Sequence, residues 1–505
     1  MQQPRRSHAK VARNHFYFGI DVTRKQKVAA WLLSACMIYA DAAAAVESSV
    51  SLPELGDSAS ATFSTQQEYE LGRAWLKLFR SQVQTVSDPL LQDYLEYLIY
   101  KLASYSQLKD RRIEVVIIDN PTINAFAAPG GVVGVHNGTF LSADNEAQLA
   151  SVLGHELAHL SQRHFVRGQE QQQRTMLPTM AAMLGSLVLA ATSRGDAGIA
   201  AMAATQAASQ QAQLRFSREN EQEADRIGME TVVNAGYDAN AFASMFENML
   251  AANRFYGRNP PEFLLTHPLT ESRVADARNR ARDYPRKVYV DNLDFQLMKA
   301  RVEVQLASNA SEALKKFKGR LKGQSRNQEA DHYGLTLAYL QSSQPKEARA
   351  QLDPLLTEDP HRLAYIVTDA EIDIAMGGAE RAAEKLRQQL RVNPDNYPLT
   401  MTYANALLKI NQPQQAEAVL QAQVKLRPTD PDVWYLLAET HGLAGNIVGV
   451  HQARAEYFVL NGVLDKAEKQ LSYALPLVKG DNVTTTKIEE RIRQIKALKE
   501  QMQKM

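Results

Sequence analysis

The C-terminal part of the chain repeats itself every 34 residues, and this period strongly limits how it can fold. Three sets of identical residues share the period, namely Pro360, Pro394 and Pro428; Ala348, Ala382 and Ala416; and Leu352, Leu386 and Leu420. The period is typical of tetratricopeptide repeats, in which small Ala residues let paired helices pack closely and Pro ends the second helix. We therefore predict an all-α tetratricopeptide-repeat superhelix over 294–505, closed by a charged capping helix near 487–504.

A His-Glu-x-x-His motif lies far upstream of the repeats, at 155–159. On a helix this spacing puts both imidazoles on one face, where they can bind a single metal ion. Zinc in a hydrolytic site takes three protein ligands and leaves one position for water. The motif therefore predicts a site for one Zn²⁺ per chain, with His155 and His159 as ligands and Glu156 as the base that takes the proton of the water.

The third zinc ligand must come from elsewhere, and an acid-rich segment about 60 residues downstream offers it. Glu221 and Asp225 are four residues apart, so a helix puts them on one face. We predict that Glu221 binds the metal and that Asp225 accepts a hydrogen bond from a ligating His. Taken alone, the segment is also consistent with a solvated acidic helix. Glu223 is expected to point away from the metal. His164 is expected to leave the ligand face of the helix because it comes five residues after His159.

The His-Glu-x-x-His motif, followed by Glu-x-x-Ala-Asp at 221–225, resembles the gluzincin metallopeptidases that include the CaaX prenyl proteases and the HtpX heat-shock proteases. The resemblance implies that His155, His159 and Glu221 bind zinc and that Glu156 is the general base. It is most specific to exported members of this family that carry a C-terminal helical repeat array, because the plain membrane-embedded members lack one.

Resemblance to these exported members also implies what the protein acts on. The implied substrates are outer-membrane β-barrel proteins, which it would degrade when stalled or misfolded and assist in assembly, with the barrel-assembly machinery as a partner. The alternative is a non-catalytic repeat-based chaperone or adaptor with a restrained or structural zinc site. A cytosolic repeat scaffold is a third possibility, if the N-terminal signal is spurious. The net charge of +1 gives no indication of nucleic-acid binding.

A signal peptide is predicted within residues 1–45, where a basic cluster and an apolar run (28–39) are followed by small residues. The run is too short to span a membrane stably. A lipobox that ends at Cys36 is the alternative and would anchor the chain as a lipoprotein. Either way we predict export to the periplasm. The small polar residues of 46–64 are expected to form a linker.

We predict an α+β zincin-type metallopeptidase domain over 65–290, mostly helical with a small sheet. A β-branched run at 113–119 and a turn at 129–131 between two short segments indicate three strands. The last strand is our candidate for an edge strand that holds an extended substrate by backbone pairing, and a purely structural hairpin is the alternative. Its residues are Val132, Val133, Gly134, Val135 and His136. Asp144 is expected to cap the helix that carries the zinc motif.

Two further segments of the catalytic domain carry candidate functions. Residues 177–212 are apolar and Ala-rich and predict a helical hairpin that packs within the domain or makes a peripheral membrane contact. His267 lies in a Thr-His-Pro sequence that resembles an element of the same family branch. It is a catalytic candidate that could stabilise the oxyanion. It could equally occupy the open position of the zinc and shut the enzyme off, and the sequence leaves both roles open.

Overall fold

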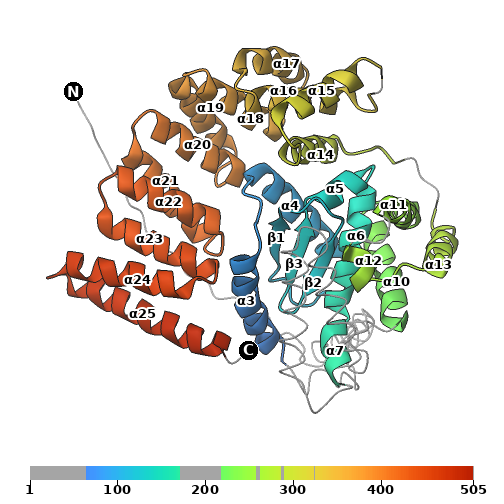
Figure 1. Cartoon of the computed structure of the whole chain (residues 1–505), viewed down its shortest axis with the longest axis horizontal. Coiled ribbons are helices and arrows are strands. Elements are labelled where there is room, and N and C mark those ends of the chain that lie inside the picture. Colours follow the sequence, from blue (N-terminus) through green and yellow to red (C-terminus); the bar gives the residue numbers. More distant parts are fainter. Residues whose placement is uncertain (1–63, 171–217, 257–261, 286–288, 324, 504–505) are drawn as a thin grey trace, which may run out of the picture. The chain divides into compact units, whose positions relative to one another are not determined.

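The computed structural model describes residues 64–170, 218–256, 262–285, 289–323 and 325–503 (Figure 1). The predicted signal peptide, Cys36 and the 177–212 segment lie outside these residues. So does the predicted linker, except Ser64, whose side chain caps the first described helix. Within the described ranges, every helix is too short or too polar to cross a membrane.

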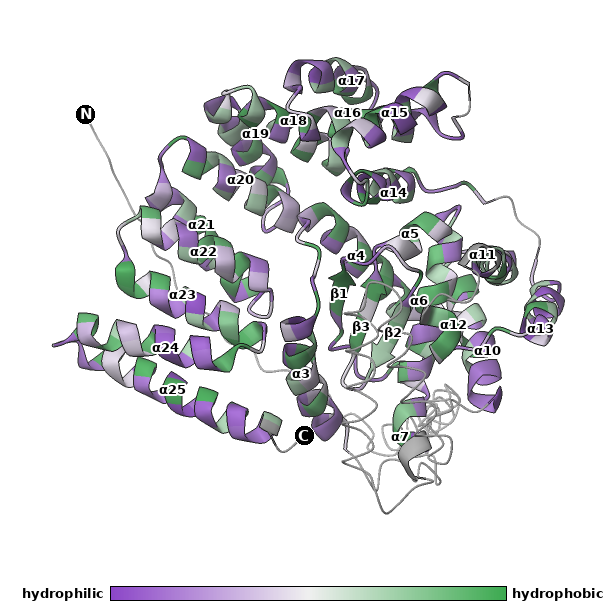
Figure 2. Cartoon of the chain, in the orientation of Figure 1, coloured by the Kyte–Doolittle hydropathy of each residue, from purple (hydrophilic) through white to green (hydrophobic). Residues whose placement is uncertain are grey.

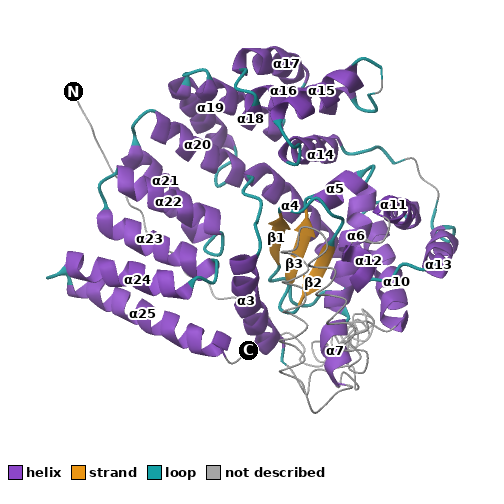
Figure 3. Cartoon of the chain, in the orientation of Figure 1, coloured by secondary structure: helices purple, strands orange, loops and turns teal. Residues whose placement is uncertain are grey.

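The N-terminal half of the described chain is mostly helical and contains three short strands, which confirms the predicted α+β class (Figure 3). Its elements are α3 (Thr65–Gln82), α4 (Pro89–Tyr105), β1 (Glu114–Ile118), β2 (Ala125–Ala128), β3 (Val132–His136), α5 (Gly138–Ser142), α6 (Glu146–Ser161), α7 (His164–Glu170), α10 (Arg218–Asn234), α11 (Asn240–Tyr256), α12 (Glu262–Thr266) and α13 (Glu271–Ala281).

The three strands form one sheet in the order β1-β3-β2. β3 pairs in parallel with β1 and in antiparallel with β2, so both of its edges are occupied. The prediction that 132–136 is an edge strand is therefore wrong. All five residues of β3 are buried, and the Phe126 ring fills the space beside Gly134. Among the residues that the structure describes, the edge without a partner strand belongs instead to β2.

Both faces of the sheet are covered, which explains why its strands are apolar apart from Glu114 and His136 at their ends (Figure 2). Successive residues of β1 point to opposite faces. Val116 and Ile118 join a cluster around Trp75 and Phe79 of α3, whereas Ile117 lies in the larger cluster that includes α4 and α6. The sheet is thus fixed between α3 and the helix that carries the zinc motif.

The C-terminal half is all-α and confirms the predicted repeats. Its elements are α14 (Leu293–Gln305), α15 (Ala310–Leu321), α16 (Gln328–Gln341), α17 (Pro345–Glu358), α18 (Leu363–Ala375), α19 (Ala379–Val392), α20 (Tyr397–Lys409), α21 (Pro413–Leu426), α22 (Pro431–Leu443), α23 (Ile447–Leu460), α24 (Leu464–Ala474), the 3₁₀ helix η1 (Leu475–Val478) and α25 (Asn482–Gln503). The period-34 Ala and Leu residues are fully buried in α17, α19 and α21, and a Pro follows two residues after each of these helices.

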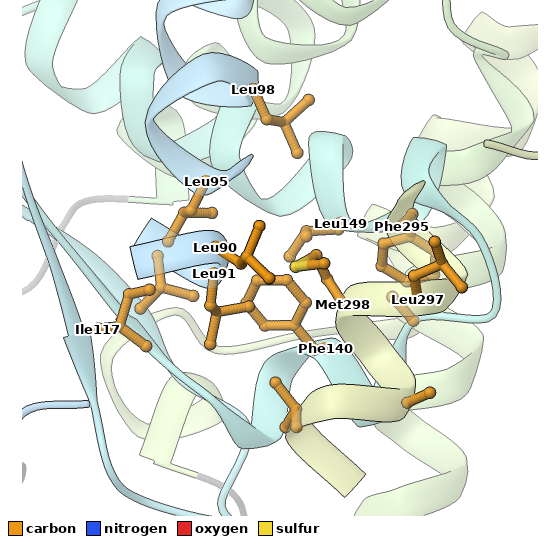
Figure 4. Packing of buried hydrophobic residues seen from close by; sticks show 14 of the residues in the cluster. Leu90, Leu91, Leu95, Leu98, Ile117, Phe140, Leu149, Phe295, Leu297 and Met298 are labelled. Carbon is orange, nitrogen blue, oxygen red and sulfur yellow. The ribbon is translucent and has the colours of Figure 1, made fainter. Parts of the chain in front are cut away.

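The first helix after the predicted domain boundary packs into the core of the peptidase part. Phe295 and Met298 of α14 lie beside Phe140 and Leu149 (Figure 4). The rings of Phe140 and Phe295 stack with their centroids 6.4 Å apart. The boundary between 290 and 294 remains a prediction, but α14 and the catalytic helices share one hydrophobic core.

Candidate metal centre

The helix that carries the zinc motif is α6, which is buried over most of its length. Its N-cap is Asn145, whose side chain accepts a hydrogen bond from the N–H of Gln148, so the expected cap at Asp144 is wrong by one residue. Helical spacing brings the Nε2 atoms of His155 and His159 to 3.0 Å from each other. Nitrogen lone pairs this close repel unless a proton or a cation lies between them.

Helix α10 packs against α6 and adds a carboxylate to the two histidines. Glu221 Oε2 lies 3.5 Å from His155 Nε2, and Glu221 Oε1 lies 3.5 Å from His159 Nε2. Zinc–ligand bonds of about 2.0–2.1 Å put the ligand atoms of a tetrahedral site about 3.3–3.4 Å apart. The observed separations of 3.0–3.5 Å therefore fit a single zinc ion held by these three residues.

His267 is the fourth member of the cluster. The ligand atoms of His155, His159, Glu221 and His267 all lie within 4.8 Å of one another. His267 Nδ1 is 3.4 Å from His155 Nε2 and 3.1 Å from Glu221 Oε1, so it lies beside the predicted metal ligands. Its other ring nitrogen, Nε2, faces Oε1 of Glu156 at 3.5 Å.

Asp225 lies one helical turn beyond Glu221 and contacts the first histidine of the motif. Its Oδ1 atom is 2.9 Å from His155 Nδ1, which leaves Nε2 of that ring for the metal. The guanidinium of Arg273 donates to both oxygens of Asp225 at 2.7 Å. It also lies 2.9 Å from Glu221 Oε2. Burial acts to raise the pKa of Asp225, but the hydrogen bonds from Arg273 and His155 lower it below its ordinary value.

Arg273 is a residue of this site to which the sequence motifs gave no role. It is buried on α13, 48 residues after Asp225, and binds both Glu221 and Asp225 of α10. Two buried carboxylates need a cation in contact with them. Arg273 could therefore have been suspected from the sequence, because it is an Arg that closely follows the Thr-His-Pro sequence.

Glu156 is buried, and its carboxylate lies next to the free edge of β2. His136 N–H donates to Asn124 O at 2.9 Å, so in the antiparallel pair the backbone groups of Ala125 and Ala127 point away from β3. The Ala127 N–H donates to Glu156. Burial raises the pKa of Glu156, although the nearby His267 and His155 act to lower it. A carboxylate with a raised pKa is suited to take up and return a proton near neutral pH.

Comparisons with known proteins agree with this architecture. The model of peptidase family M48 matches residues 89–281, and a tetratricopeptide-repeat model matches residues 373–440. The β-barrel assembly-enhancing protease of Escherichia coli K12 is 37% identical over 479 residues, covering 94% of this chain and 97% of the relative. A putative β-barrel assembly-enhancing protease of Vibrio cholerae is 36% identical, covering 89% and 93%. The mitochondrial metalloendopeptidase OMA1 of Schizosaccharomyces pombe is 31% identical over 181 residues, covering 36% of this chain and 50% of that protein.

Fold and site together define a metallopeptidase of family M48 that is joined to tetratricopeptide repeats. Within that class, the chain belongs to the family of the β-barrel assembly-enhancing proteases, because the identity extends over nearly the full length of both chains. The predicted metallopeptidase activity and the predicted family are thereby confirmed.

Proposed function

We propose that the chain is an exported zinc endopeptidase in which His155, His159 and Glu221 bind one Zn²⁺. The observation that carries this proposal is the convergence of their ligand atoms at separations that suit zinc, beside the buried carboxylate of Glu156. A catalytic zinc site usually has three protein ligands with nitrogen or oxygen donor atoms and a fourth coordination position for water or substrate.

In the proposed reaction, a bound zinc ion would polarise a water molecule and the scissile carbonyl group. Glu156 takes the proton from that water and later gives it to the leaving amine, so no covalent intermediate is required. The Ala127 N–H holds the Glu156 carboxylate in place. An extended substrate pairs with the free edge of β2 through Ala125 and Ala127, which places its backbone beside Glu156.

We further propose that His267 restrains the enzyme. Its Nδ1 atom lies beside the predicted zinc ligands, where it would compete with a catalytic water, and its Nε2 atom faces the carboxylate that would activate this water. The described arrangement is then a closed state, and peptide cleavage requires His267 to move aside. The alternative role, as a donor to the oxyanion, requires the same movement first.

The proposed substrates are outer-membrane β-barrel proteins in the periplasm. The names of the relatives, which are β-barrel assembly-enhancing proteases, support this choice. A repeat superhelix offers an extended surface for holding polypeptides, which suits a chaperone-like role and contact with the barrel-assembly machinery. Export rests on the signal-peptide pattern of 1–45, with lipidation of Cys36 as the minor variant, and 177–212 is the proposed peripheral membrane contact.

The test is a cleavage assay of the purified chain with zinc content measured in each variant. The substrates are an unfolded outer-membrane β-barrel protein and, as a control, an unfolded water-soluble protein. We expect Glu156→Gln to retain zinc and to lose about 10²–10⁴-fold in rate, because proton transfer is removed. We expect His267→Ala to retain zinc and to cleave faster than wild type, because the restraint is removed.

Other outcomes would overturn parts of this proposal. Slower cleavage by His267→Ala would make His267 a catalytic donor. Equal cleavage of the two substrates would remove the preference for β-barrel proteins. If zinc is bound and neither wild type nor His267→Ala cleaves anything, the chain acts as a repeat-based adaptor with a structural zinc site.

A further inference from the structure

His164, the first residue of α7, lies directly behind His159 on the side away from the metal ligands. Its side chain is fully buried. His164 Nδ1 is 2.9 Å from His159 Nδ1, and His164 Nε2 is 3.0 Å from Oε2 of Glu223. Arg167 donates to the same Glu223 oxygen at 3.0 Å. A continuous chain of polar contacts therefore leads from a metal ligand through a second imidazole to a carboxylate of α10.

His164 lies off the ligand face, as expected, but the helix does not continue to it. α6 ends at Ser161, and Arg163 adopts a left-handed backbone conformation with φ of 50°. This conformation is unfavourable for a residue with a side chain, and an ion pair between Arg163 and Glu68 stabilises it. The turn redirects the chain so that His164 faces back toward His159.

The contacts determine where the protons of both imidazoles lie when a metal is bound. A neutral His159 that uses Nε2 for the metal carries its proton on Nδ1 and donates it to His164 Nδ1. His164 then carries its own proton on Nε2 and donates it to Glu223. His155 Nδ1 contacts a carboxylate directly, that of Asp225, whereas His159 Nδ1 contacts His164, which in turn contacts the carboxylate of Glu223.

We propose that His164 is a positioning residue for the metal site: with Glu223 it fixes the tautomer and ring orientation of His159. This inference rests on the proposed zinc site, and it assigns a function to two residues that no motif included. Glu223 and Arg167 are partly exposed, with 29% and 46% of their side-chain surface accessible. The chain of polar contacts therefore begins inside the core and ends at the surface.

The competing explanation is that His164 only holds α7 against α10 through Glu223. Three substitutions distinguish the positioning role from this purely structural role. His164→Asn can present an amide oxygen where Nδ1 lies, so it keeps the acceptor for His159 but cannot reach Glu223. His164→Gln can present an amide N–H where Nε2 lies, so it keeps the contact with Glu223 but not the acceptor. His164→Phe keeps the ring and removes both contacts.

The measurement is the rate of zinc loss from each full-length protein to a chelator, together with the absorption spectrum of the Co²⁺-substituted form. We expect His164→Phe and His164→Gln to bind zinc about 10–100-fold more weakly than wild type, as is usual when such a partner is lost. His164→Asn should stay within a few-fold of wild type. The Co²⁺ spectrum should change for Phe and Gln and not for Asn. Arg278→Ala, which removes an exposed ion pair with Glu247, is the control and should leave zinc binding unchanged.

The thermal unfolding midpoint of the metal-free proteins completes the test. If His164 only positions His159, the metal-free variants should have unfolding midpoints close to that of the metal-free wild type. The proposal is overturned if His164→Gln retains zinc better than His164→Asn, if no variant loses affinity, or if the losses follow a lower metal-free midpoint. Failure of the zinc site itself would be distinct, because wild type would then bind no zinc.

Discussion

Gly154 of α6 and Gly228 of α10 lie against each other with no room for a side chain on either. A Cβ atom at Gly228 would be 2.9 Å from the carbonyl carbon and oxygen of Gly154, and one at Gly154 would be 3.0 Å from the carbonyl oxygen of Gly228. Real Cβ atoms essentially never lie closer than 3.0 Å to such atoms, so Gly228 falls below this limit and Gly154 lies at it. The two glycines therefore set how closely α10 approaches the zinc motif, and hence whether Glu221 reaches the histidines.

We expect Gly228→Ala to push α10 away from α6, because the obstructing atoms belong to the backbone and cannot move aside. Overpacking of this kind costs about 1–3 kcal/mol, and we expect zinc affinity to fall at least about tenfold in parallel. Unfolding in denaturant and zinc titration measure the two effects. The matched control is Gly319→Ala in α15, where a Cβ meets nothing within 4 Å and Ala favours the helix by up to about 1 kcal/mol. A Gly228→Ala protein as stable as wild type would contradict the close approach.

Removal of Arg273 should destabilise the metal-free protein as well as the zinc site. Arg273→Met leaves Glu221 and Asp225 buried without their shared cation, a change that costs about 3–5 kcal/mol. The measurement is the unfolding free energy after zinc has been removed. Arg278→Met is the control, because its ion pair with Glu247 is largely exposed and should contribute less than about 1 kcal/mol. Equal stability of the two variants would show that Arg273 is not needed for the fold.

Local periodicity was sufficient to predict much of this molecule. The four-residue spacings of His155 with His159 and of Glu221 with Asp225 depend only on helix geometry, which is why the structure places each pair on one face. The 34-residue period likewise predicted the buried Ala positions, because one small residue per repeat must lie where two helices touch.

Features that depend on distant parts of the chain could not be predicted in this way. β3 is the central strand because β1 pairs with β3 and not with β2, which comes between them in the sequence. The sequence does not reveal this order, because strands that are buried on both faces show no alternation of polar and apolar residues. The contact between His164 and His159 was not predicted, because a non-glycine residue, Arg163, adopts a left-handed conformation just after the helix ends. The cap of α6 was misplaced because Asp144 and Asn145 are adjacent and both are good caps.

The free edge of β2 predicts where an extended substrate binds. Ala125→Pro removes an outward-facing N–H that the sheet does not use, so the strand should still pair with β3. We expect kcat/KM for an unfolded protein substrate to fall about tenfold, mainly through KM, with zinc content unchanged. Ala127→Pro should lose more, and in kcat as well, because its N–H also holds Glu156. Unchanged kinetics in both variants would show that the substrate does not pair with β2.

The contact between the repeats and the peptidase part should strengthen at mildly acidic pH. Asp432 of α22 borders a cavity together with Arg80 of α3 and Glu96 of α4. Burial, reinforced by the neighbouring Asp430, raises the pKa of Asp432 from 3.8 to about 6. Between these two values, Asp432 is therefore more often protonated in the folded protein than in the unfolded chain. This contribution to stability is complete below pH 3.8 and is lost as the pH rises through about 6.

We therefore expect Asp432→Asn to stabilise the chain more at pH 7.5 than at pH 5, by about 1 kcal/mol, because an amide carries no charge at either pH. Unfolding in denaturant at the two pH values, followed by far-ultraviolet circular dichroism, measures the difference. Asp353→Asn, whose carboxylate is 59% exposed, is the control and should show no such difference. A stabilisation by Asp432→Asn that is equal at both pH values would mean that this carboxyl group does not couple protonation to the contact.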